Sequence, residues 1–511
     1  MIATVSTSAL MGIDALPVAL EIDFARQGLP AFIMVGLAEG AVREAKERVF
    51  SALKSSGFKL PPARITVNLA PADVRKEGSG YDLPLAIGLM AAAGIIPTES
   101  LQGWQLAGEL SLTGELKPVP GALPMAAQAR ASGARGIILP AANAAEAAVV
   151  EGLPVYGART LGQVAAHLAG KEEIAPTACD LDGLWRERES FLLDFSEVKG
   201  QEHAKRAIEI AAAGNHNLLF LGPPGSGKTM LARRIPTVLP PLSFDEALEV
   251  TKVYSVSGSL PPDTPLMVTR PFRSPHHTIS DAGLIGGGQY PRPGEVSLAH
   301  RGVLFLDELP EFKKHVLEVL RQPLEDGQVT ISRAAVSLSF PASLMLVAAM
   351  NPCPCGYSGD ERHDCTCTPV GVQRYRSRLS GPLLDRIDLH VEVPAVDYKE
   401  LRATGQGSDS AAMRGRILTA RQVQAERYAG QPILTNSQLS GRLLERFCAL
   451  GEAEHAFLGQ AVQRLGLSAR AYTRVLRIGR TIADLASAEA ISVAHLAEAI
   501  NYRSMDRQAR G

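Results

Sequence analysis

The sequence contains no hydrophobic run long enough to cross a membrane. Its longest apolar stretch, 83–97, has about fifteen residues and is interrupted by Pro84, Gly88 and Gly94, whereas a membrane-spanning helix needs roughly twenty. We expect a buried helix there instead. No lysine or arginine precedes Arg26, so the positively charged start of a secretory signal is also missing. These absences predict a cytoplasmic protein without a membrane partner.

Excess charge of either sign is missing as well. A net charge of -1, with 21% charged and 46% hydrophobic residues, is typical of an ordinary folded protein and identifies no partner. The 511 residues are too many for one core and suggest about two to four domains. Cysteine is scarce too: four of the six cysteines lie between 353 and 367, which makes a poor disulfide framework but a plausible metal cluster.

The pattern of the chain predicts three domains and a linker. Residues 1–168 mix strand-like pieces with amphipathic helices, the clearest of which is 39–55. Residues 169–189 are polar and break the periodicity, as a linker does. Between 190 and 395, strand-like runs alternate with helical segments, which is the pattern of a parallel α/β sheet. Residues 396–511 carry helical patterns and end in a basic segment.

A glycine-rich loop between a strand and a helix is the strongest signal in the sequence. After the apolar strand 218–221 come Gly222, Pro223, Pro224, Gly225, Ser226, Gly227, Lys228 and Thr229, and then a helical segment. This order is that of a P-loop. Its backbone N–H groups surround phosphate oxygens, its lysine neutralises the β- and γ-phosphates, and its threonine hydroxyl binds magnesium. The loop therefore predicts an ATP site with Mg²⁺.

Two further strands bring polar side chains to the same edge of the predicted sheet. The apolar strand 303–306 ends in Asp307 and Glu308, and the strand 344–350 ends in Asn351. Asp307 would complete the magnesium shell, Glu308 would polarise the attacking water, and Asn351 would sense the γ-phosphate. Alone, two adjacent carboxylates or an asparagine before a proline would indicate a surface turn. The P-loop upstream favours the catalytic interpretation.

Two C-x-C pairs could bind a metal ion. Cys353 and Cys355 are separated by nine residues from Cys365 and Cys367, and four thiolates can surround one zinc ion tetrahedrally. The spacing is tighter than that of a C-x₂-C knuckle, so reduced thiols without metal are the alternative. Because Cys353 follows Asn351 by two positions, a metal here would stiffen the sensor loop.

Longer motifs give the sequence a specific resemblance. The segments PFRSPHHT at 271–278, AAMNPCPCG at 348–356 and LLDRIDLHVEV at 383–393 resemble the magnesium-chelatase-like AAA+ family, in particular its YifB/ComM branch. The resemblance extends over nearly the whole chain. It implies an α/β protein with an N-terminal Lon-protease-like α+β domain, an AAA+ P-loop α/β core and a C-terminal α-helical lid.

The resemblance also assigns roles to arginines. Arg386 matches the arginine finger, which would stabilise the γ-phosphate bound by a neighbouring subunit of a homo-oligomeric, hexameric ring. Without the resemblance, an ion pair with Asp385 or Asp388 would be the simpler interpretation. Arg470 matches the second sensor, which would contact nucleotide when the helical lid closes, and Arg474 is the reserve candidate.

The resemblance further suggests DNA contacts. The segment 328–339 is expected to form a β-hairpin, which family architecture places towards a central pore, with Arg333 near its tip. The stretch 272–300 would form a second insertion. Its candidate phosphate contacts are Arg273, His276, His277 and Arg292, although the two histidines could equally pack against each other. Between 464 and 510, eight arginines outnumber four acidic residues, but helical arginine rows are more often solvated faces.

The first domain resembles the catalytic domain of Lon-type proteases, which the recombination protein RadA also carries. The stretches KEGSGYDL and GELSLTGELKPVPGALP carry the match. The Lon nucleophile position falls on Gly80 and the Lon lysine position on Pro124, and neither residue can do the chemistry. Ser79 is one place away, and Lys117 is seven. We expect a scaffold or DNA-binding domain that has lost the protease activity.

The function that follows from this resemblance is ATP hydrolysis coupled to movement on DNA. The chain would be a hexameric motor, a helicase for branch migration of recombination intermediates, as in natural transformation. The DNA part depends on the resemblance, since a net charge near zero gives it no independent support. The alternative is a chelatase-type motor subunit that remodels a protein partner for metal insertion. An ATP-dependent protease is opposed by Gly80 and Pro124.

Overall fold

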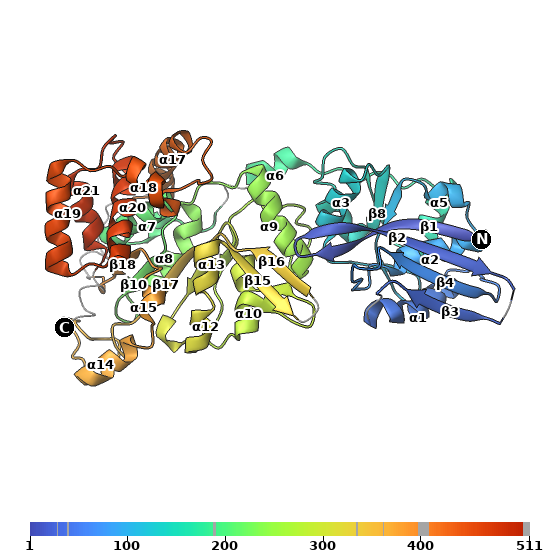
Figure 1. Cartoon of the computed structure of the whole chain (residues 1–511), viewed down its shortest axis with the longest axis horizontal. Helices are drawn as coiled ribbons and strands as arrows, with labels where there is room; N and C mark the ends of the chain where they lie inside the picture. Colours follow the sequence, from blue (N-terminus) through green and yellow to red (C-terminus); the bar gives the residue numbers. More distant parts are fainter. Residues whose placement is uncertain are drawn as a thin grey trace. The chain divides into compact units, whose positions relative to one another are not determined.

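The computed structural model describes two compact units of the chain (Figure 1). The described residues are 1–27, 29–37, 40–187, 191–333, 336–360, 362–396 and 408–503. The first unit comprises Met1–Glu187, Ser243–Val268 and Ser332–Phe340, and the second comprises Arg188–Leu242, Thr269–Ile331 and Pro341–Gly511. Two segments from within the expected ATPase range thus group with the first unit. The expected domain boundaries stay a prediction.

A seven-stranded mixed sheet forms the centre of the first unit, in the order β3-β4-β2-β1-β5-β8-β9. The long antiparallel pair β1 and β2 alternates buried and exposed residues, which is the pattern of strands with one face on a core. The parallel strands β5, β8 and β9 are short and mostly apolar. The strands of this unit are β1 Ile2–Met11, β2 Asp14–Ala25, β3 Ala31–Val35, β4 Arg64–Ala70, β5 Trp104–Leu106, β6 Glu109–Leu110, β7 Leu116–Lys117, β8 Gly136–Pro140 and β9 Val155–Ala158.

Helices of the first unit confirm the local sequence patterns. The amphipathic segment expected at 39–55 forms α1 from Gly40, and residues 83–92 of the apolar stretch lie in α2, in which every residue is buried. In the described part of the chain, no helix has the length and apolarity needed to cross a bilayer. The helices are α1 Gly40–Ser55, α2 Asp82–Ala92, η1 Thr98–Leu101, α3 Ala122–Ala131, α4 Ala141–Ala147, α5 Leu161–Leu168, α6 Leu181–Glu187 and α9 Phe244–Ser257.

Helix α9 belongs to the first unit although it follows the P-loop helix in the sequence. It packs against α3, and the backbone N–H of Gly121 donates to the carbonyl oxygen of Ser255 at 3.0 Å. Lys252 of α9 donates to the Asp14 carboxylate at 2.8 Å. These contacts join three distant stretches of sequence, which a local pattern does not reveal.

The second unit contains the parallel sheet that the sequence predicts. Its order is β11-β14-β17-β10-β18, and each neighbouring pair is parallel. The central strands are apolar and fully buried, as expected for strands covered on both faces. All five therefore point their carboxyl ends to one edge. The strands are β10 Leu218–Leu221, β11 Phe272–Arg273, β14 Val303–Leu306, β17 Met345–Met350 and β18 Leu389–Glu392.

Helices surround this sheet and continue into a C-terminal helical region, which confirms the expected α/β fold. The chain also forms two short two-stranded ribbons: β12 Gly286–Gly287 with β13 Arg292–Pro293, and β15 Gln328–Arg333 with β16 Val336–Pro341. The helices before β18 are η2 Phe195–Glu197, α7 Glu202–Gly214, α8 Lys228–Arg234, η3 Ile235–Thr237, α10 Asp281–Ile285, α11 Glu295–Leu298, η4 Leu309–Glu311, α12 Lys314–Glu318, α13 Arg321–Asp326, α14 Pro369–Arg376 and α15 Gly381–Leu384. The C-terminal helices are α17 Ser410–Arg427, η5 Asn436–Gln438, α18 Gly441–Phe447, α19 Glu452–Leu465, α20 Ala469–Leu485 and α21 Val493–Asn501.

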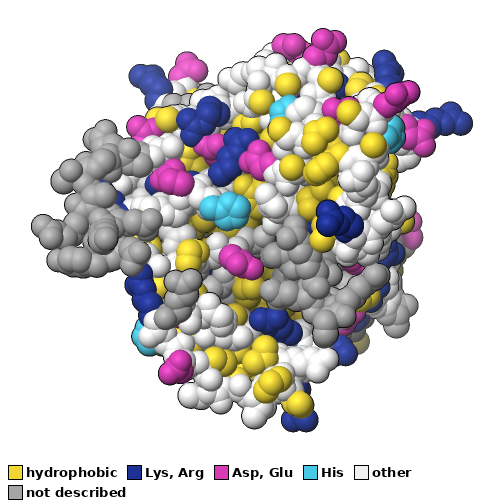
Figure 2. Space-filling view, turned by 90° about the vertical axis from the view of Figure 1, so that its left-hand side faces the viewer, with side chains coloured by type: hydrophobic (Ala, Val, Ile, Leu, Met, Phe, Trp, Pro, Cys, Tyr) yellow, Lys and Arg dark blue, Asp and Glu magenta, His cyan; other side chains and the backbone are white. Residues whose placement is uncertain are grey.

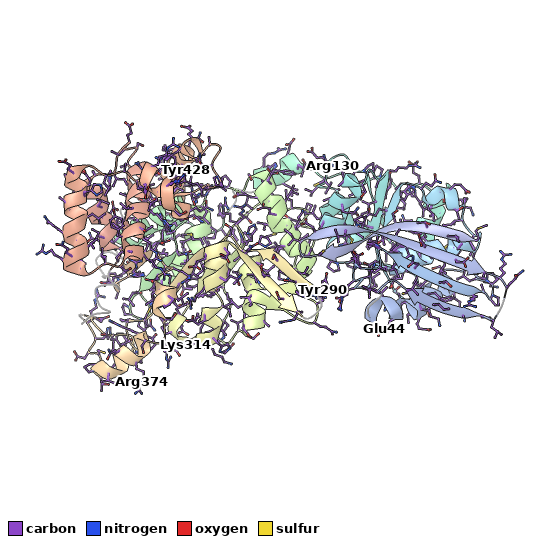
Figure 3. All side chains as sticks on the ribbon, viewed as in Figure 1. Glu44, Arg130, Tyr290, Lys314, Arg374 and Tyr428 are labelled. Atoms are coloured by element: carbon purple, nitrogen blue, oxygen red, sulfur yellow. The ribbon has the colours of Figure 1, made fainter. Side chains whose placement is uncertain are left out.

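A buried chain of hydrogen bonds ties the C-terminal helices to the sheet. Tyr428, at the end of α17 (Figure 3), donates its hydroxyl to Asn436 Oδ1 at 2.5 Å. Asn436 Nδ2 donates to Thr481 Oγ1 of α20 at 3.0 Å, and that hydroxyl lies 2.8 Å from Nε2 of His216, just before β10. Satisfied buried polar groups specify one arrangement, because breaking any of them leaves an unpaired group in a medium of low polarity. The helical region is therefore fixed on the sheet.

The surface over the C-terminal helices carries charges of both signs. Figure 2 views this end, and its dark blue and magenta side chains are interspersed rather than separated. Helix α19 itself begins with acidic residues and ends with Arg464. Part of the arginine excess in this region is also buried within the fold, namely Arg474, Arg480 and Arg503. On the described part of this face, the excess therefore makes no one-sided basic patch.

Candidate nucleotide site

The glycine-rich loop follows β10 at the carboxyl edge of the sheet and leads directly into α8. Gly225 and Gly227 have φ of +75° and +92°, a left-handed conformation that side chains other than glycine rarely adopt. A Cβ at Gly222 would collide with the carbonyl oxygen of Val393. These glycines let the backbone turn tightly enough for its N–H groups to face a phosphate.

Lys228 lies inside this loop with its ammonium group held by three acceptors. Its Nζ donates to the carbonyl oxygens of Gly222 at 2.7 Å and Pro223 at 2.8 Å, and to Oδ1 of Asn351 at 3.2 Å. Burial lowers the pKa of Lys228, while the carboxylates of Asp307 and Glu308 oppose that shift. The lysine and the sensor candidate from the neighbouring strand β17 therefore meet at one point.

The two magnesium-ligand candidates are also in contact. Thr229 Oγ1 donates to Asp307 Oδ2 at 2.7 Å, although 78 positions separate them in the sequence. The other carboxylate oxygen, Oδ1, accepts from the backbone N–H of Glu308 at 2.9 Å. A hydroxyl and a carboxylate are oxygen ligands of the kind that Mg²⁺ prefers beside phosphate oxygens. These side chains would hold the ion, and the ion would neutralise charge on the transferred phosphoryl group.

Glu308 occupies a left-handed backbone conformation, with φ of +52°, directly after the buried strand β14. Its carboxylate Oε2 lies 3.5 Å from Nδ1 of His277. His277 reaches this place because β11 is the parallel neighbour of β14. The rings of His276 and His277 are 4.1 Å apart, so the histidines do pack on each other, but His277 also faces Glu308 and Phe312.

The contact with His277 predicts restrained hydrolysis. A carboxylate oxygen engaged by an imidazole is less available to polarise water, so His277→Ala should raise DNA-free turnover and leave the KM for ATP unchanged. Because the side chains are 32% and 56% exposed, the pair is worth at most about 1 kcal/mol, which gives a two- to fivefold effect. Steady-state ATPase assays measure it, with the exposed His315 changed to alanine as control. A fall in turnover would contradict this interpretation.

The arginine-finger and second-sensor candidates lie at the opposite, amino-terminal edge of the sheet. Arg386 precedes β18, donates to Pro382 O at 2.6 Å and pairs with Glu325. Arg470 Nη1 of α20 lies 3.3 Å from Asp385. The structure thus brings these two arginines close together. In the part of the chain that it describes, their contacts are with acidic and backbone groups of this edge, not with the P-loop.

These arginines line a cavity of about 600 Å³ at that edge. Arg474, the reserve candidate, pairs through Nε with Asp388 at 3.2 Å. Burial alone would raise the pKa of Asp388, but His216 and the nearby arginines lower it to about 2, so the carboxylate stays ionised. Among described residues, Arg386 Nε and Arg474 Nη1 are buried without a hydrogen-bond partner. The ion pair first considered for Arg386, with Asp385 or Asp388, is thus replaced by the pair with Glu325.

The four cysteines after Asn351 come together at the carboxyl edge, where their sulfur atoms all lie within 4.8 Å of one another. Cys353 is buried, Cys355 and Cys367 are partly buried, and Cys365 is exposed. All four are free of disulfide bonds. Four sulfur atoms at such distances make a set of ligands for a soft or borderline metal ion.

The three arginines proposed as DNA contacts differ in their exposure to solvent and in their ion pairs. Arg333 is exposed at the end of β15, while 334–335 lie outside the described residues. Arg292 is exposed beside the glycine ribbon. Arg273 instead forms a bidentate pair with Glu295, with both distances 2.6 Å, so its charge is neutralised within the protein. The structure therefore leaves Arg333 and Arg292 as the more accessible charges.

Among the described residues of the first unit, no serine–lysine pair forms at the positions that the protease resemblance suggested. Ser79 donates to the Glu109 carboxylate, and Lys117 pairs with Glu115 at 2.9 Å. Lys76 is fully buried and donates to the carbonyl oxygen of Pro71. Nucleophilic catalysis by serine needs a base within hydrogen-bond reach. The described side chains around Ser79 supply a carboxylate there rather than the lysine of Lon-type proteases.

Comparison with known proteins finds relatives of the whole chain. Residues 194–401 match the family described as magnesium chelatase, subunit ChlI; residues 20–143 match subunit ChlI of Mg-chelatase; and residues 407–503 match the C-terminal part of subunit ChlI. The chain is 47% identical to competence protein ComM of Haemophilus influenzae, over 99% of this chain and 98% of that protein. It is 44% identical to protein YifB of Escherichia coli, over 98% and 97%. The magnesium-chelatase 38 kDa subunit of Rhodobacter capsulatus is 28% identical over 39% of this chain and 55% of that protein.

Proposed function

The chain belongs to the family of the ComM and YifB proteins, with magnesium-chelatase-type AAA+ domains, and from that membership we propose that it is a ring-forming ATPase that moves branched DNA. The observation that carries the ATPase is the convergence of Lys228, Thr229, Asp307 and Asn351 at one edge of the sheet. That set can bind Mg·ATP, neutralise the γ-phosphate and position the water beside Glu308.

Assembly into a ring, which we take to be a hexamer, is supported by the position of the arginines. Arg386 and Arg470 both lie at the edge opposite the P-loop, so both would act on the nucleotide of a neighbouring subunit. The contact of Arg470 with nucleotide on closure of the helical lid stays a prediction. Arg386 Nε, which is buried beside the adjacent cavity without a hydrogen-bond partner among the described residues, supports a place for an incoming anionic group.

DNA as the substrate is supported by the relationship to a competence protein over nearly the full chain. We propose that single-stranded or branched DNA passes through the ring, and that the activity is helicase-like migration of recombination intermediates in the cytoplasm. The alternative is a chelatase-type motor that remodels a protein partner for metal insertion. This alternative is favoured by the matches to magnesium chelatase families, which cover the ATPase domains.

ATPase assays with different DNA forms separate the two functions. The turnover should rise in the presence of single strands and most of all with a four-way junction, compared with no DNA and plain duplex. Migration of labelled junctions should then require ATP. A wild-type protein that hydrolyses ATP but neither binds nor moves forked or four-way DNA at low salt would rule out the DNA motor and leave the chelatase-type function.

Arg333→Ala should slow junction migration while leaving DNA-free ATP hydrolysis nearly intact. The exposed guanidinium at the end of β15 can bind backbone phosphates of any sequence. Losing one such contact should reduce the slope of log affinity against log salt by about one. Fluorescence anisotropy at several salt concentrations measures this slope. Arg374→Ala, an exposed arginine on α14 (Figure 3), is the control and should leave the slope unchanged.

Two metal ions belong to the proposal. Mg²⁺ would be held by Thr229 and Asp307 together with the phosphates of ATP. Zn²⁺ would be held by Cys353, Cys355 and the second C-x-C pair, as a structural ion with no open position.

A further inference from the structure

Three of the four cysteine sulfurs have the spacing of a metal tetrahedron, and the fourth, that of Cys367, lies within 4.8 Å of the others. With Zn–S bonds of about 2.3 Å, a regular tetrahedron sets its sulfur atoms about 3.8 Å apart. The Sγ atom of Cys353 lies 3.3 Å from that of Cys355 and 3.7 Å from that of Cys365, and the Sγ atoms of Cys355 and Cys365 are 3.6 Å apart. These separations exceed a disulfide bond of about 2.05 Å and approach the tetrahedral value.

Backbone groups around the cluster already point at the sulfur atoms. The N–H of Ser358 donates to Cys353 Sγ at 3.3 Å, and the N–H of Cys355 donates to Cys367 Sγ at 3.4 Å. Donors of this kind fix the orientation of metal ligands and stabilise their negative charge. The loop is thus shaped for thiolates as well as for the ion.

The same loop packs against the nucleotide site. A Cβ at Gly356 would lie 2.5 Å from Cδ of Pro224, so the bare glycine touches the P-loop itself. Two residues before the first cysteine, Asn351 accepts from the ammonium of Lys228. On the other side, Arg376 of α14 donates to the carbonyl oxygen of Pro352 at 3.1 Å. The cysteine loop therefore connects the sensor strand, the P-loop and α14.

We propose that the four cysteines bind one zinc ion, and that this zinc knuckle acts as a brace. It holds the P-loop and the sensor residue Asn351 in their nucleotide-binding positions. The ion fixes the turn between Cys353 and Gly356. That turn holds Pro224 and limits the positions of Asn351. Removing the ion releases both contacts, so the nucleotide site loses its preorganised shape and binds ATP more weakly. This role rests on the proposed ATPase, whereas the metal site does not.

Elemental analysis of protein purified without added metal tests the ion. We expect about one zinc per chain, lost in the double variant Cys353→Ser/Cys355→Ser and retained in Cys179→Ser, a cysteine outside the cluster. If the double variant does not fold, chelation of the wild type followed by readdition of zinc gives the same comparison. Zinc near zero in the wild type would overturn the site. Iron in its place, visible as absorption of light, would overturn the assignment to zinc.

A matched pair of glycine variants tests the brace. Gly356 and Gly359 have φ of +91° and +83°, but nothing lies within 4 Å of a Cβ at Gly359. Both alanine variants carry similar backbone strain, so only Gly356→Ala should disturb Pro224. We expect Gly356→Ala to keep its zinc and bind a fluorescent ATP analogue about tenfold more weakly, while Gly359→Ala keeps both.

Zinc removal should produce the same tenfold weakening, measured with excess Mg²⁺ present so that chelator does not deprive the nucleotide of its own ion. Unchanged affinity in Gly356→Ala and in the zinc-free protein would overturn the brace. A wild type that holds zinc but binds no ATP would instead refute the proposed ATPase and, with it, the brace, while the metal site would stand.

Discussion

Lys228→Ala should weaken ATP binding at least about a hundredfold, whereas Glu308→Gln should bind ATP as wild type does and hydrolyse it roughly 10²–10⁴ times more slowly. The ammonium of Lys228 sits in the loop with its acceptors in place, and each charge-assisted contact that it makes with phosphate contributes about 1.5–3 kcal/mol. Glu308→Gln leaves these contacts of Lys228 intact and removes only the carboxylate that polarises water.

Binding of a fluorescent nucleotide and single-turnover hydrolysis separate these two effects. Lys314→Ala, an exposed lysine at the start of α12 (Figure 3), is the control for a general loss of positive charge. Equal ATP affinity in wild type and Lys228→Ala would contradict the assignment of the P-loop lysine. A Glu308→Gln protein that turns over at the wild-type rate would show that another group acts on the water.

The nucleotide-binding loop was predictable from the sequence because its determinants are local. A strand, a glycine run and a helix start follow one another within about a dozen residues, and the physical demands of phosphate binding fix their types. The strand ending at Asp307 and the strand ending at Asn351 are also local patterns. Their meeting at one edge follows from the rule that parallel strands carry ligands at their carboxyl ends, and the structure shows it in the Thr229–Asp307 hydrogen bond.

Sheet order, in contrast, is a non-local property. Nothing in the sequence near His277 says that β11 pairs with β14, and that pairing alone brings the histidine to Glu308. The only signal was the pair of adjacent histidines within the segment 271–278. Likewise, the neighbour of Gly356 is Pro224, 132 positions away. Long-range pairings of this kind depend on packing that single-sequence patterns do not encode.

The sequence alone did not predict where Arg386 lies in the fold. Its position leads to the second large expected effect, on ATP hydrolysis. It lies at the amino-terminal edge of the sheet, and a four-residue strand at about 3.3 Å per residue separates that edge from the P-loop by about 13 Å. An arginine finger must contact the phosphate directly. If Arg386 is the proposed finger, it must therefore act on the site of another subunit, and Arg386→Ala should lower hydrolysis about 10³–10⁵-fold with ATP affinity nearly unchanged.

Mixing two inactive proteins tests action between subunits. In a ring that contains Arg386→Ala and Glu308→Gln subunits, an Arg386→Ala subunit keeps its own Glu308 and can receive Arg386 from a Glu308→Gln neighbour. At equal ratio, about a quarter of the interfaces should carry both intact residues, because each contact in the ring is heterologous. Hydrolysis should then recover towards that fraction of the wild-type rate. In the control, Glu308→Gln subunits are mixed with subunits that carry both changes, so every site lacks Glu308 and no recovery should occur. If mixed rings are demonstrated by differential tagging and hydrolysis stays at the level of the separate variants at every ratio, Arg386 is not the finger, and its pair with Glu325 is structural.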